Sequence, residues 1–401
     1  MAATDTDYVR ISWFAIMQQF PATSLAKGPA SSPFRIAGRL IGSGYPAYIV
    51  AELSANHNQD FRQARDLVHA AKEAGADAVK LQTYTPDTIT IACDRECFRI
   101  GGGTLWDGRT LHELYREAYT PWDWHPKLKQ LADQVGIHLF SSPFDVSAVD
   151  FLETINVPAY KLASCELVDL PLIRKLAGTG KPLIISTGMA TIDDIEEALA
   201  TARDAGAREL ALLKCTSAYP APPEEMHLRT IPAFIQRFRI AVGLSDHTTG
   251  IAAPVAAVAL GACIIEKHLT LSRTLGGPDA EFSLEPDEFR EMVAAVRIAE
   301  KALGSVQFGP TLHEQSSQRF RRSLFVVQDM EQGEAFTSDN VRSIRPADGL
   351  HTRYMTQILG KRAAQPIARG TPLQWDLIAE DRICESDGAV GDLIGADRPL
   401  K

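Results

Sequence analysis

The sequence predicts an α/β fold whose main part is a TIM barrel, followed by a small β-rich domain. Two observations lead to this prediction. From Tyr48 onward, short apolar runs alternate with amphipathic stretches, and eight such pairs fit within about 270 residues, the size of a TIM barrel. After Gly304 this alternation fades, and strand-like pieces separated by glycine-containing turns begin. A doubly wound open sheet is the alternative for the first part.

The eight predicted strands are each short and apolar, and nearly all precede a helical pattern such as "DFRQARDLVHAAKEAG". In chain order they are "YIVAE", "DAVKLQT", "GIHLFSS", "AYKLAS", "KPLIIST", "RELALLKCT", "FRIAVGLSD" and "ACIIEKH". A long insert between Thr83 and Pro121 follows the second strand and contains "IGGGTLWDGRT". An insert of this length is typically either a lid or disordered.

The remaining segments divide the chain further. Residues 1–33 form an N-terminal extension without the features of a signal peptide, and Met17 could be the true start. The barrel is expected over 34–305, a polar linker over 306–322, the β-rich domain over 323–380 and a polar tail over 381–401.

Composition narrows the class of protein. The 401 residues are 45% hydrophobic and 23% charged, and the formal net charge is -9. This acidic balance argues against nucleic acid or an anionic membrane surface as a partner. The apolar run "VAAVALGACII" is too short to span a bilayer and is followed by Glu266 and Lys267. The six cysteines are scattered, which favours reduced thiols and a cytoplasmic protein.

Polar and ionisable residues close the predicted strands, where the active site of a TIM barrel is built. In chain order they are Glu52, Asn56 and His57; Lys80 and Gln82; Ser141 and Ser142; Lys161, Ser164 and Glu166; Ser186 and Thr187; Lys214 and Thr216; Ser245, Asp246 and His247; and Glu266 and His268. Nearly every strand end therefore offers a group that could contact a polar substrate.

Two lysines, Lys80 and Lys161, lie within otherwise apolar strands. Each could be a snorkelling or ion-paired lysine, because a buried ammonium needs a counter-charge. Together with the neighbouring hydroxyl groups they favour a pocket for an anion, a phosphate or a carboxylate.

Two histidines, His247 and His268, end the last two strands, so both rings can reach one face of the barrel mouth. Such a pair, with a carboxylate and waters, suits a divalent transition metal such as manganese, iron or cobalt. A hydrogen-bonded structural histidine is the alternative for each ring. Glu52 could be the carboxylate ligand, or it could stabilise a cationic intermediate.

The strand-end motifs "AELSANHN", "GADAVKLQTYTPDTIT", "FSSPFD", "AYKLASCE", "ISTGMAT", "LKCTSAYP", "GLSDHT" and "EKHLT" resemble the sialic acid synthase family, from about Ile41 to Ile378. The resemblance implies a TIM barrel that joins phosphoenolpyruvate to an amino-sugar aldehyde at a divalent metal, Mn²⁺ or else Mg²⁺ or Co²⁺. It also implies that the β-rich segment is a SAF (antifreeze-like) domain.

The resemblance assigns roles to single residues. Metal ligands match His247 and His268, and phosphoenolpyruvate contacts match Lys80, Lys161, Ser164, Ser186 and Ser245. Glu52 and Tyr219 match groups near the reacting carbons, and Gln82, Ser142 and Glu166 are further expected substrate contacts. Ser217 departs from the asparagine of typical members. Arg345, in "RPADG", matches an arginine that enters the partner's site in a homodimer with swapped C-terminal domains.

Within the family, the sequence is most similar to the pseudaminic acid synthase branch, through the segments "LQTYTPDT", "GGTLWDGRTLHELYREAYTPWDWH" and "RPADGLH". That branch implies 2,4-diacetamido-2,4,6-trideoxy-β-L-altropyranose as the sugar. A synthase for legionaminic or N-acetylneuraminic acid is the first alternative. A sugar-binding or ice-binding protein with an inert barrel is the second, and the buried charges argue against it.

Overall fold

The computed structural model describes residues 33–379. The expected tail over 381–401, the candidate start at Met17 and the expected extension, apart from Pro33, lie outside the described residues. Contacts divide the chain into two compact units, with the boundary between Gly304 and Ser305. Each unit is described by itself below.

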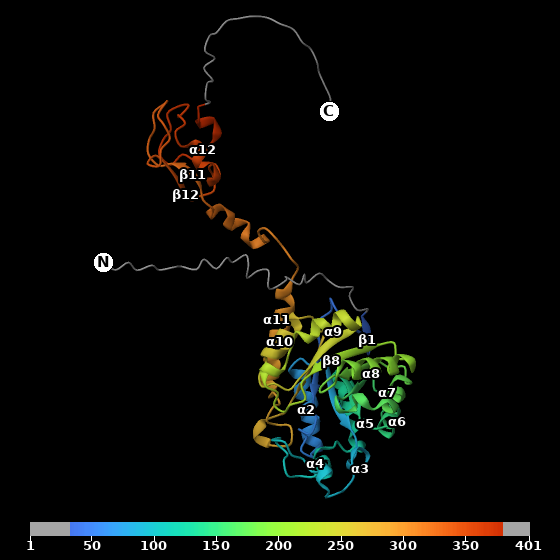
Figure 1. The fold of residues 1–401 in the computed structure, drawn as a ribbon. Coiled ribbons are helices and arrows are strands. Elements are labelled where there is room, and N and C mark those ends of the chain that lie inside the picture. Colours follow the sequence, from blue (N-terminus) through green and yellow to red (C-terminus); the bar gives the residue numbers. More distant parts are fainter. Residues whose placement is uncertain (1–32, 380–401) are drawn as a thin grey trace, which may run out of the picture. The chain divides into compact units, whose positions relative to one another are not determined.

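The first unit contains a closed barrel of eight parallel strands, so the predicted TIM barrel is confirmed (Figure 1). Each strand pairs with the next along the chain, and the last pairs with the first. The strands are β3 (Tyr48–Glu52), β4 (Ala78–Thr83), β5 (His138–Pro143), β6 (Tyr160–Leu162), β7 (Leu183–Ser186), β8 (Leu210–Cys215), β9 (Ala241–Asp246) and β10 (Ile264–His268).

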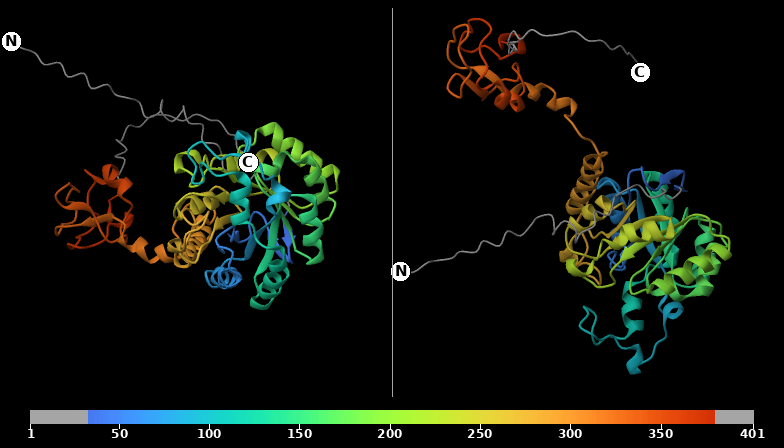
Figure 2. Two further views of the ribbon diagram at one scale, coloured as in Figure 1. Left: turned by 90° about the horizontal axis from the view of Figure 1, so that it is seen from below. Right: turned by 45° about the horizontal axis from the view of Figure 1, so that its top comes forward.

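Helices cover the outside of the barrel (Figures 1 and 2). Their starts follow local sequence rules: the side chain of Asp60 caps α2, and Thr191 forms a capping box with Asp194 at α8. The helices around the barrel are α2 (Phe61–Glu73), α5 (His125–Val135), α6 (Val146–Thr154), α7 (Leu170–Ala177), α8 (Ile192–Asp204), α9 (Thr230–Phe238), α10 (Ala252–Ala259) and α11 (Pro286–Leu303).

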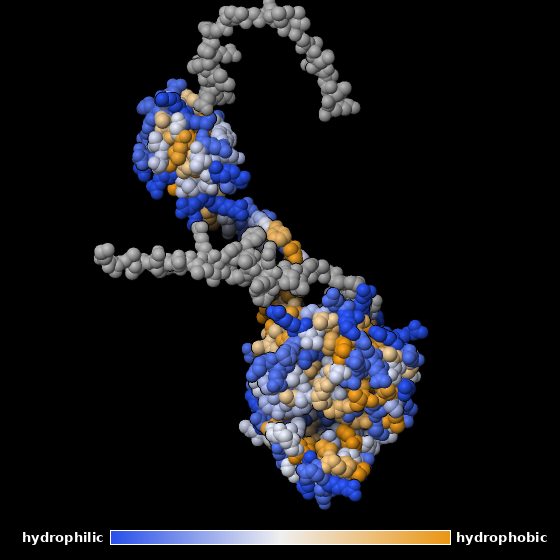
Figure 3. Space-filling view, in the orientation of Figure 1, coloured by the Kyte–Doolittle hydropathy of each residue, from blue (hydrophilic) through white to orange (hydrophobic). Residues whose placement is uncertain are grey.

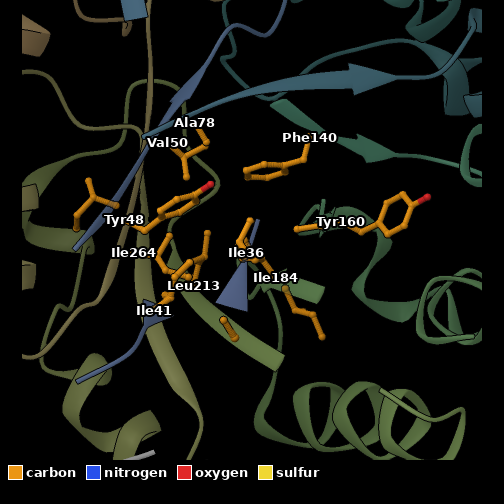
Figure 4. Close-up of a cluster of buried hydrophobic side chains, with 14 of the residues drawn as sticks. Ile36, Ile41, Tyr48, Val50, Ala78, Phe140, Tyr160, Ile184, Leu213 and Ile264 are labelled. Carbon is orange, nitrogen blue, oxygen red and sulfur yellow. The ribbon is translucent and has the colours of Figure 1, made fainter. Parts of the chain in front are cut away.

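A short hairpin, not predicted from the sequence, precedes the barrel. Its strands are β1 (Phe34–Ile36) and β2 (Arg39–Ile41), and they pair antiparallel. The buried side chains of Ile36 and Ile41 belong to the same hydrophobic cluster as Val50, Phe140 and Ile264 of the barrel strands (Figure 4). The hairpin therefore contributes apolar side chains to the barrel core.

The strand register separates an apolar layer of the barrel interior from a polar one. Parallel partners, and residues two apart on one strand, point to the same side, so the apolar pair Val50 and Ala78 is followed on the same face by the charged pair Glu52 and Lys80. One interior position must be glycine: a Cβ on Gly243 would lie 2.3 Å from the carbonyl oxygen of Ile264. The polar layer lies toward the C-terminal ends of the strands, where the site residues were expected.

The insert after β4 is a structured segment. It contains α3 (Pro86–Ile89), a short 3₁₀ turn over Glu96–Phe98 and α4 (Leu111–Ala118), and α3 and α4 project beyond one end of the barrel (Figures 1 and 2). Its far end is tied to the barrel by His57, whose Nε2 lies 3.0 Å from Oγ1 of Thr120. Of the two alternatives, the helices and contacts of the insert contradict a disordered loop, and the lid stays a prediction.

The second unit is small and β-rich, as predicted. Strands β11 (Ser323–Val326) and β12 (Val341–Ile344) pair antiparallel, and α12 (Met355–Ile358) follows them. Its own core contains Leu324, Phe336 and Leu373. The segment before β11, expected as a polar linker, contains two 3₁₀ turns over Leu312–Glu314 and Ser316–Phe320. None of the helices in residues 33–379 is long and apolar enough to cross a membrane.

Candidate active site

The register of the first, second and last barrel strands brings three expected site residues side by side. Glu52 on β3 lies opposite Lys80 on β4 and opposite His268 on β10. On the neighbouring strand pair, Ser245 of β9 lies opposite Glu266 of β10. Because parallel partners share a face, all five side chains point into the barrel at its C-terminal end.

A network of buried charges occupies this end of the barrel. The ammonium of Lys80 contacts the carboxylate of Glu52 and lies 3.9 Å from that of Glu266. Lys161 lies 3.6 Å from the other oxygen of Glu266. The hydroxyl of Ser245 donates to Glu266 over 2.9 Å. Two ammonium groups therefore face two carboxylates, which corresponds to the ion-paired reading of the lysines.

Hydroxyl and amide groups extend this network. Lys80 donates to the Ser142 hydroxyl over 3.3 Å. The side-chain amide of Gln82 donates to Glu52 over 3.1 Å and to Ser54 over 3.3 Å. The expected contacts Gln82 and Ser142 are thus hydrogen-bonded to the charged residues at the centre of the site.

Burial sets the protonation of these groups. It raises the pKa of Glu52, and Lys80 only partly offsets that effect. It lowers the pKa of Lys161, although Glu266 acts in the opposite direction. Burial also acts to raise the pKa of Glu266, but Lys161 and Lys80 outweigh it and the net shift is downward. Glu266 is therefore the carboxylate most firmly held in its charged form.

The ends of β6, β7 and β8 form a second part of the site. The backbone N–H of Gly188 donates to the Ser164 hydroxyl over 3.1 Å. A Cβ on Gly188 would lie 2.1 Å from Oγ of Ser217, so only glycine allows this approach. The buried hydroxyl of Ser186 has no hydrogen-bond partner among the described residues. These groups leave hydrogen-bonding capacity directed at a bound molecule.

Glu166 lies just after β6, in a 3₁₀ turn over Cys165–Val168. Burial raises its pKa to about 7, and the charge of Lys161 lowers it only in part. One of its carboxylate oxygens is buried without a hydrogen-bond partner in the described structure. Such a group can accept or donate a proton near neutral pH.

The two candidate metal ligands lie together. The ring centroids of His247 and His268 are 5.3 Å apart. Nδ1 of His247 lies 2.9 Å from the carbonyl oxygen of Thr216, which leaves Nε2 of that ring free to bind a metal. Burial lowers the pKa of His268 well below its usual value, and its Nδ1 has no hydrogen-bond partner within residues 33–379. His268 is therefore a neutral imidazole, the form that ligates metals.

Two aromatic residues lie against the histidines. The ring of Tyr219 is 4.4 Å from that of His247, and the ring of Phe282 is 4.9 Å from that of His268. Trp106, from the insert, lies 5.8 Å from Tyr219. Tyr219 was expected at the site from its place in the sequence, whereas Phe282 and Trp106 were not.

The loop between β10 and α11 supplies a further group, Asp279, that was not predicted from the sequence. Asp279 accepts hydrogen bonds from the hydroxyl of Ser54 and from the N–H of Ala55, and burial raises its pKa. Through Ser54 it joins Gln82 and Glu52. The sequence contains one signal for this loop, the dipeptide "GG" before "PDA". Gly276 and Gly277 both have positive φ, which allows the loop to turn back toward the site.

Some strand-end residues have structural roles instead. Asn56 donates to the carbonyl oxygen of Leu269 and to Ser283, and His57 contacts Thr120. Asp246 pairs with Lys267. Lys214 donates to the carbonyl oxygen of Cys215, its own neighbour, over 2.7 Å.

Two further expectations concern Arg345 and Glu52. Arg345 directly follows β12 in the second unit and is exposed, with no hydrogen bond or ion pair among the described residues. Glu52 was a possible third metal ligand. Its contacts run to Lys80 and Gln82, and no group of three His, Cys, Asp or Glu side chains in the described part of the chain could hold a metal ion. Both roles considered for Glu52, ligation of a metal and stabilisation of a cationic intermediate, stay predictions.

Comparison with known proteins places this chain in a family. The pattern that defines the NeuB family matches residues 67–308, and that of the SAF domain matches residues 321–379. Pseudaminic acid synthase of Helicobacter pylori is 44% identical over 82% of this chain and 97% of its own length. N,N'-diacetyllegionaminic acid synthase of Legionella pneumophila is 35% identical over 84% of this chain and 96% of its own.

A solved structure is also similar to this chain, both in fold and in sequence. The N-acetylneuraminic acid synthetase of Leptospira borgpetersenii, in complex with citrate, superposes with a TM-score of 0.64 at 32% identity. The superposition covers 72% of this chain and 95% of that one. The resemblance to sialic acid synthases that the strand-end motifs carry is thus confirmed, and the chain belongs to the NeuB family, with a SAF domain at its C-terminal end.

Proposed function

We propose that this protein is a pseudaminic acid synthase. It would condense phosphoenolpyruvate with 2,4-diacetamido-2,4,6-trideoxy-β-L-altropyranose and water, giving pseudaminic acid and phosphate. The observation that carries the proposal is the convergence of Lys80, Lys161, Glu52 and two histidines at one barrel mouth, in a chain 44% identical to a pseudaminic acid synthase. The 35% identity to the legionaminic acid synthase makes that activity the second candidate.

Phosphoenolpyruvate would bind between the two lysines and the serine hydroxyls. Its carboxylate and phosphate can replace Glu52 and Glu266 as partners of the buried ammonium groups. Ser186, whose hydroxyl is unpartnered in the described structure, can donate to an anionic oxygen. Ser164 and Ser245 line the same end of the barrel and would complete the set.

Members of this family are generally metal-dependent, and His247 and His268 fit that requirement. Both rings are buried, and each has a nitrogen that no described residue occupies. With two protein ligands, the remaining coordination positions would fall to substrate oxygens and water. A divalent cation bound there supplies Lewis-acid polarisation of the sugar aldehyde. We propose Mn²⁺, Mg²⁺ or Co²⁺ as the ion.

The reaction forms one carbon–carbon bond and breaks one carbon–oxygen bond. Carbon 3 of phosphoenolpyruvate attacks the aldehyde carbon, and the aldehyde oxygen takes up a proton. Carbon 2 then carries positive charge, which the carboxylate of Glu52 can stabilise. Water adds to carbon 2, and the tetrahedral product loses phosphate. Tyr219 would pack against the sugar beside His247, while Gln82, Ser142 and Glu166 would hydrogen-bond substrate oxygens.

A homodimer with swapped C-terminal domains would complete the site through Arg345. Two features support this proposal: Arg345 is exposed and unpaired among the described residues, and the linker carries the highly exposed apolar side chains of Val306 and Phe308, 90% and 93% exposed. Figure 3 shows hydrophobic residues on the linker near the end of α11. A second copy of the chain would cover them. A cytoplasmic location stays a prediction.

The proposal is tested by incubating the purified protein with phosphoenolpyruvate, Mn²⁺ and one sugar at a time. Phosphate release is measured with the altro-configured 2,4-diacetamido sugar, with its legionaminic acid counterpart and with N-acetylmannosamine. The highest kcat/KM is expected with the altro-configured sugar. A preference for the legionaminic acid counterpart or for N-acetylmannosamine would move the assignment to another nonulosonic acid synthase. Sugar binding without phosphate release would support the alternative of an inert barrel.

A further inference from the structure

Trp106 is a residue of the insert that reaches the site. Its indole ring lies 5.8 Å from the ring of Tyr219, which in turn lies 4.4 Å from His247. Its ring N–H donates to the carbonyl oxygen of Pro278, over 3.2 Å, in the loop that carries Asp279. The indole is therefore held between two segments, the loop after β8 that carries Tyr219 and the loop after β10 that carries Pro278.

The turn around Trp106 is fixed by its own hydrogen bonds. The carboxylate of Asp107 accepts from the backbone N–H groups of Gly103 and Thr104, each over 2.9 Å, and from the Thr104 hydroxyl over 2.7 Å. These bonds lower the pKa of Asp107, so the carboxylate stays charged at neutral pH. The position of the indole is thus set locally as well as by its contact with Pro278.

Trp106, Tyr219 and Phe282 form an apolar wall that begins at the histidines. Phe282 is buried and packs 4.9 Å from His268 and 5.2 Å from Tyr219. Trp106 extends the wall beyond Tyr219, since its ring contacts Tyr219 and, among the described residues, neither histidine ring. The indole N–H, the single polar group of Trp106, is already paired with Pro278, so its ring offers only carbon surface to a ligand.

We propose that Trp106 determines specificity for a sugar that lacks a hydroxyl group at carbon 6. This inference rests on the proposed function, in which the aldehyde carbon lies at His247 and His268. The opposite end of the open-chain sugar then meets the outer part of the wall. A methyl group there packs against the indole, whereas a hydroxyl group would lose its hydrogen bonds to water without gaining a partner. An apolar wall of this kind discriminates by roughly 10- to 100-fold.

The experiment compares two sugars that differ only at carbon 6, the 6-deoxy substrate and its 6-hydroxy counterpart. The ratio of their kcat/KM values is measured for the full chain and for Trp106→Ala, Trp106→Phe and Leu105→Ala. Leu105 is the matched control, because it is the preceding residue of the same turn and its side chain is 46% exposed.

Trp106→Ala is expected to lower the ratio about tenfold, through a higher KM for the 6-deoxy sugar, with the KM for phosphoenolpyruvate unchanged. Trp106→Phe keeps a ring and should retain most of the ratio, and Leu105→Ala should retain all of it. An unchanged ratio in Trp106→Ala, whether kcat/KM stays the same or falls equally for both sugars, overturns the inference while the proposed function stands. A native chain that uses neither sugar overturns the proposed function and this inference with it.

Discussion

The ammonium of Lys267 lies 2.6 Å from Oδ2 of Asp246, and both side chains are fully buried. Lys267 also donates to the carbonyl oxygen of Thr248, and Asp246 accepts from the Thr248 N–H over 3.0 Å. The two residues adjoin the candidate metal ligands, since Asp246 precedes His247 and Lys267 precedes His268. This ion pair therefore connects the backbone segments that carry the two rings.

Lys267→Met should destabilise the protein strongly, because it leaves the carboxylate of Asp246 buried without its cation. We expect a loss of about 3–5 kcal/mol in the free energy of unfolding, measured by urea denaturation. The matched control is Lys129→Met, whose lysine also lies 2.6 Å from an aspartate, Asp133, but at the surface. That change should cost less than about 1 kcal/mol. Equal losses in the two variants would contradict a special role for the buried pair.

His247→Ala and His268→Ala should each weaken the binding of Mn²⁺ by roughly 100-fold or more, because each removes one of two protein ligands. Binding is measured directly, by titration calorimetry or by the electron paramagnetic resonance signal of free Mn²⁺, without substrate turnover. His69→Ala, on helix α2, serves as the control and should bind the ion as the native chain does. Native-like Mn²⁺ affinity in both site variants would exclude the metal role of the pair.

Glu166 should make stability depend on pH below neutrality. Its pKa is raised from an ordinary 4.5 to about 7 by burial, so the folded state binds a proton that the unfolded state has released. The protonated group therefore adds to the free energy of unfolding below pH 4.5, and this stabilisation is lost as the pH rises to about 7. In Glu166→Gln this pH dependence should disappear from the free energy of unfolding, measured between pH 5 and 8. A native pH profile in the variant would refute the shifted pKa.

Arg345 and the swapped dimer can be tested by subunit complementation. Arg345→Ala and His247→Ala should each be nearly inactive as pure homodimers. After unfolding and refolding together, a mixed dimer would combine one intact barrel with one intact SAF domain. Activity should then return to about a quarter of the native value. If mixing restores nothing while Arg345→Ala alone is inactive, Arg345 acts within its own chain, and full activity of Arg345→Ala would remove it from the site.

Much of the fold follows from periodicity alone. All eight predicted strands are strands of the barrel. They could be recognised because each apolar run ends where the pattern changes to that of a helix or an insert. The hairpin β1–β2 escaped prediction because its three-residue strands are too short to show alternation. Its burial depends on contact with the barrel, which the local sequence does not encode.

Site residues at the ends of strands could be predicted from the sequence. Site residues on the loops that fold back over the C-terminal end of the barrel could not. Glu52, Lys80 and Glu266 follow from their places on the strands. Asp279, Phe282 and Trp106 come from long connections whose path depends on packing, as in the bond from Trp106 to Pro278. Likewise, the sequence placed Lys161 in a strand but could not show that Glu266, four strands away in the barrel order, would be its partner. The roles assigned to the site residues stay predictions.

The most direct test of the proposed chemistry follows the oxygen atom that joins carbon 2 of phosphoenolpyruvate to phosphorus. Phosphoenolpyruvate labelled with ¹⁸O at that bridge is incubated with the protein, Mn²⁺ and the 2,4-diacetamido sugar, and the phosphate is analysed by ³¹P nuclear magnetic resonance. Condensation with cleavage of the carbon–oxygen bond predicts that the released phosphate carries the label and appears only when sugar is present. Unlabelled phosphate, or release without sugar, would contradict the account.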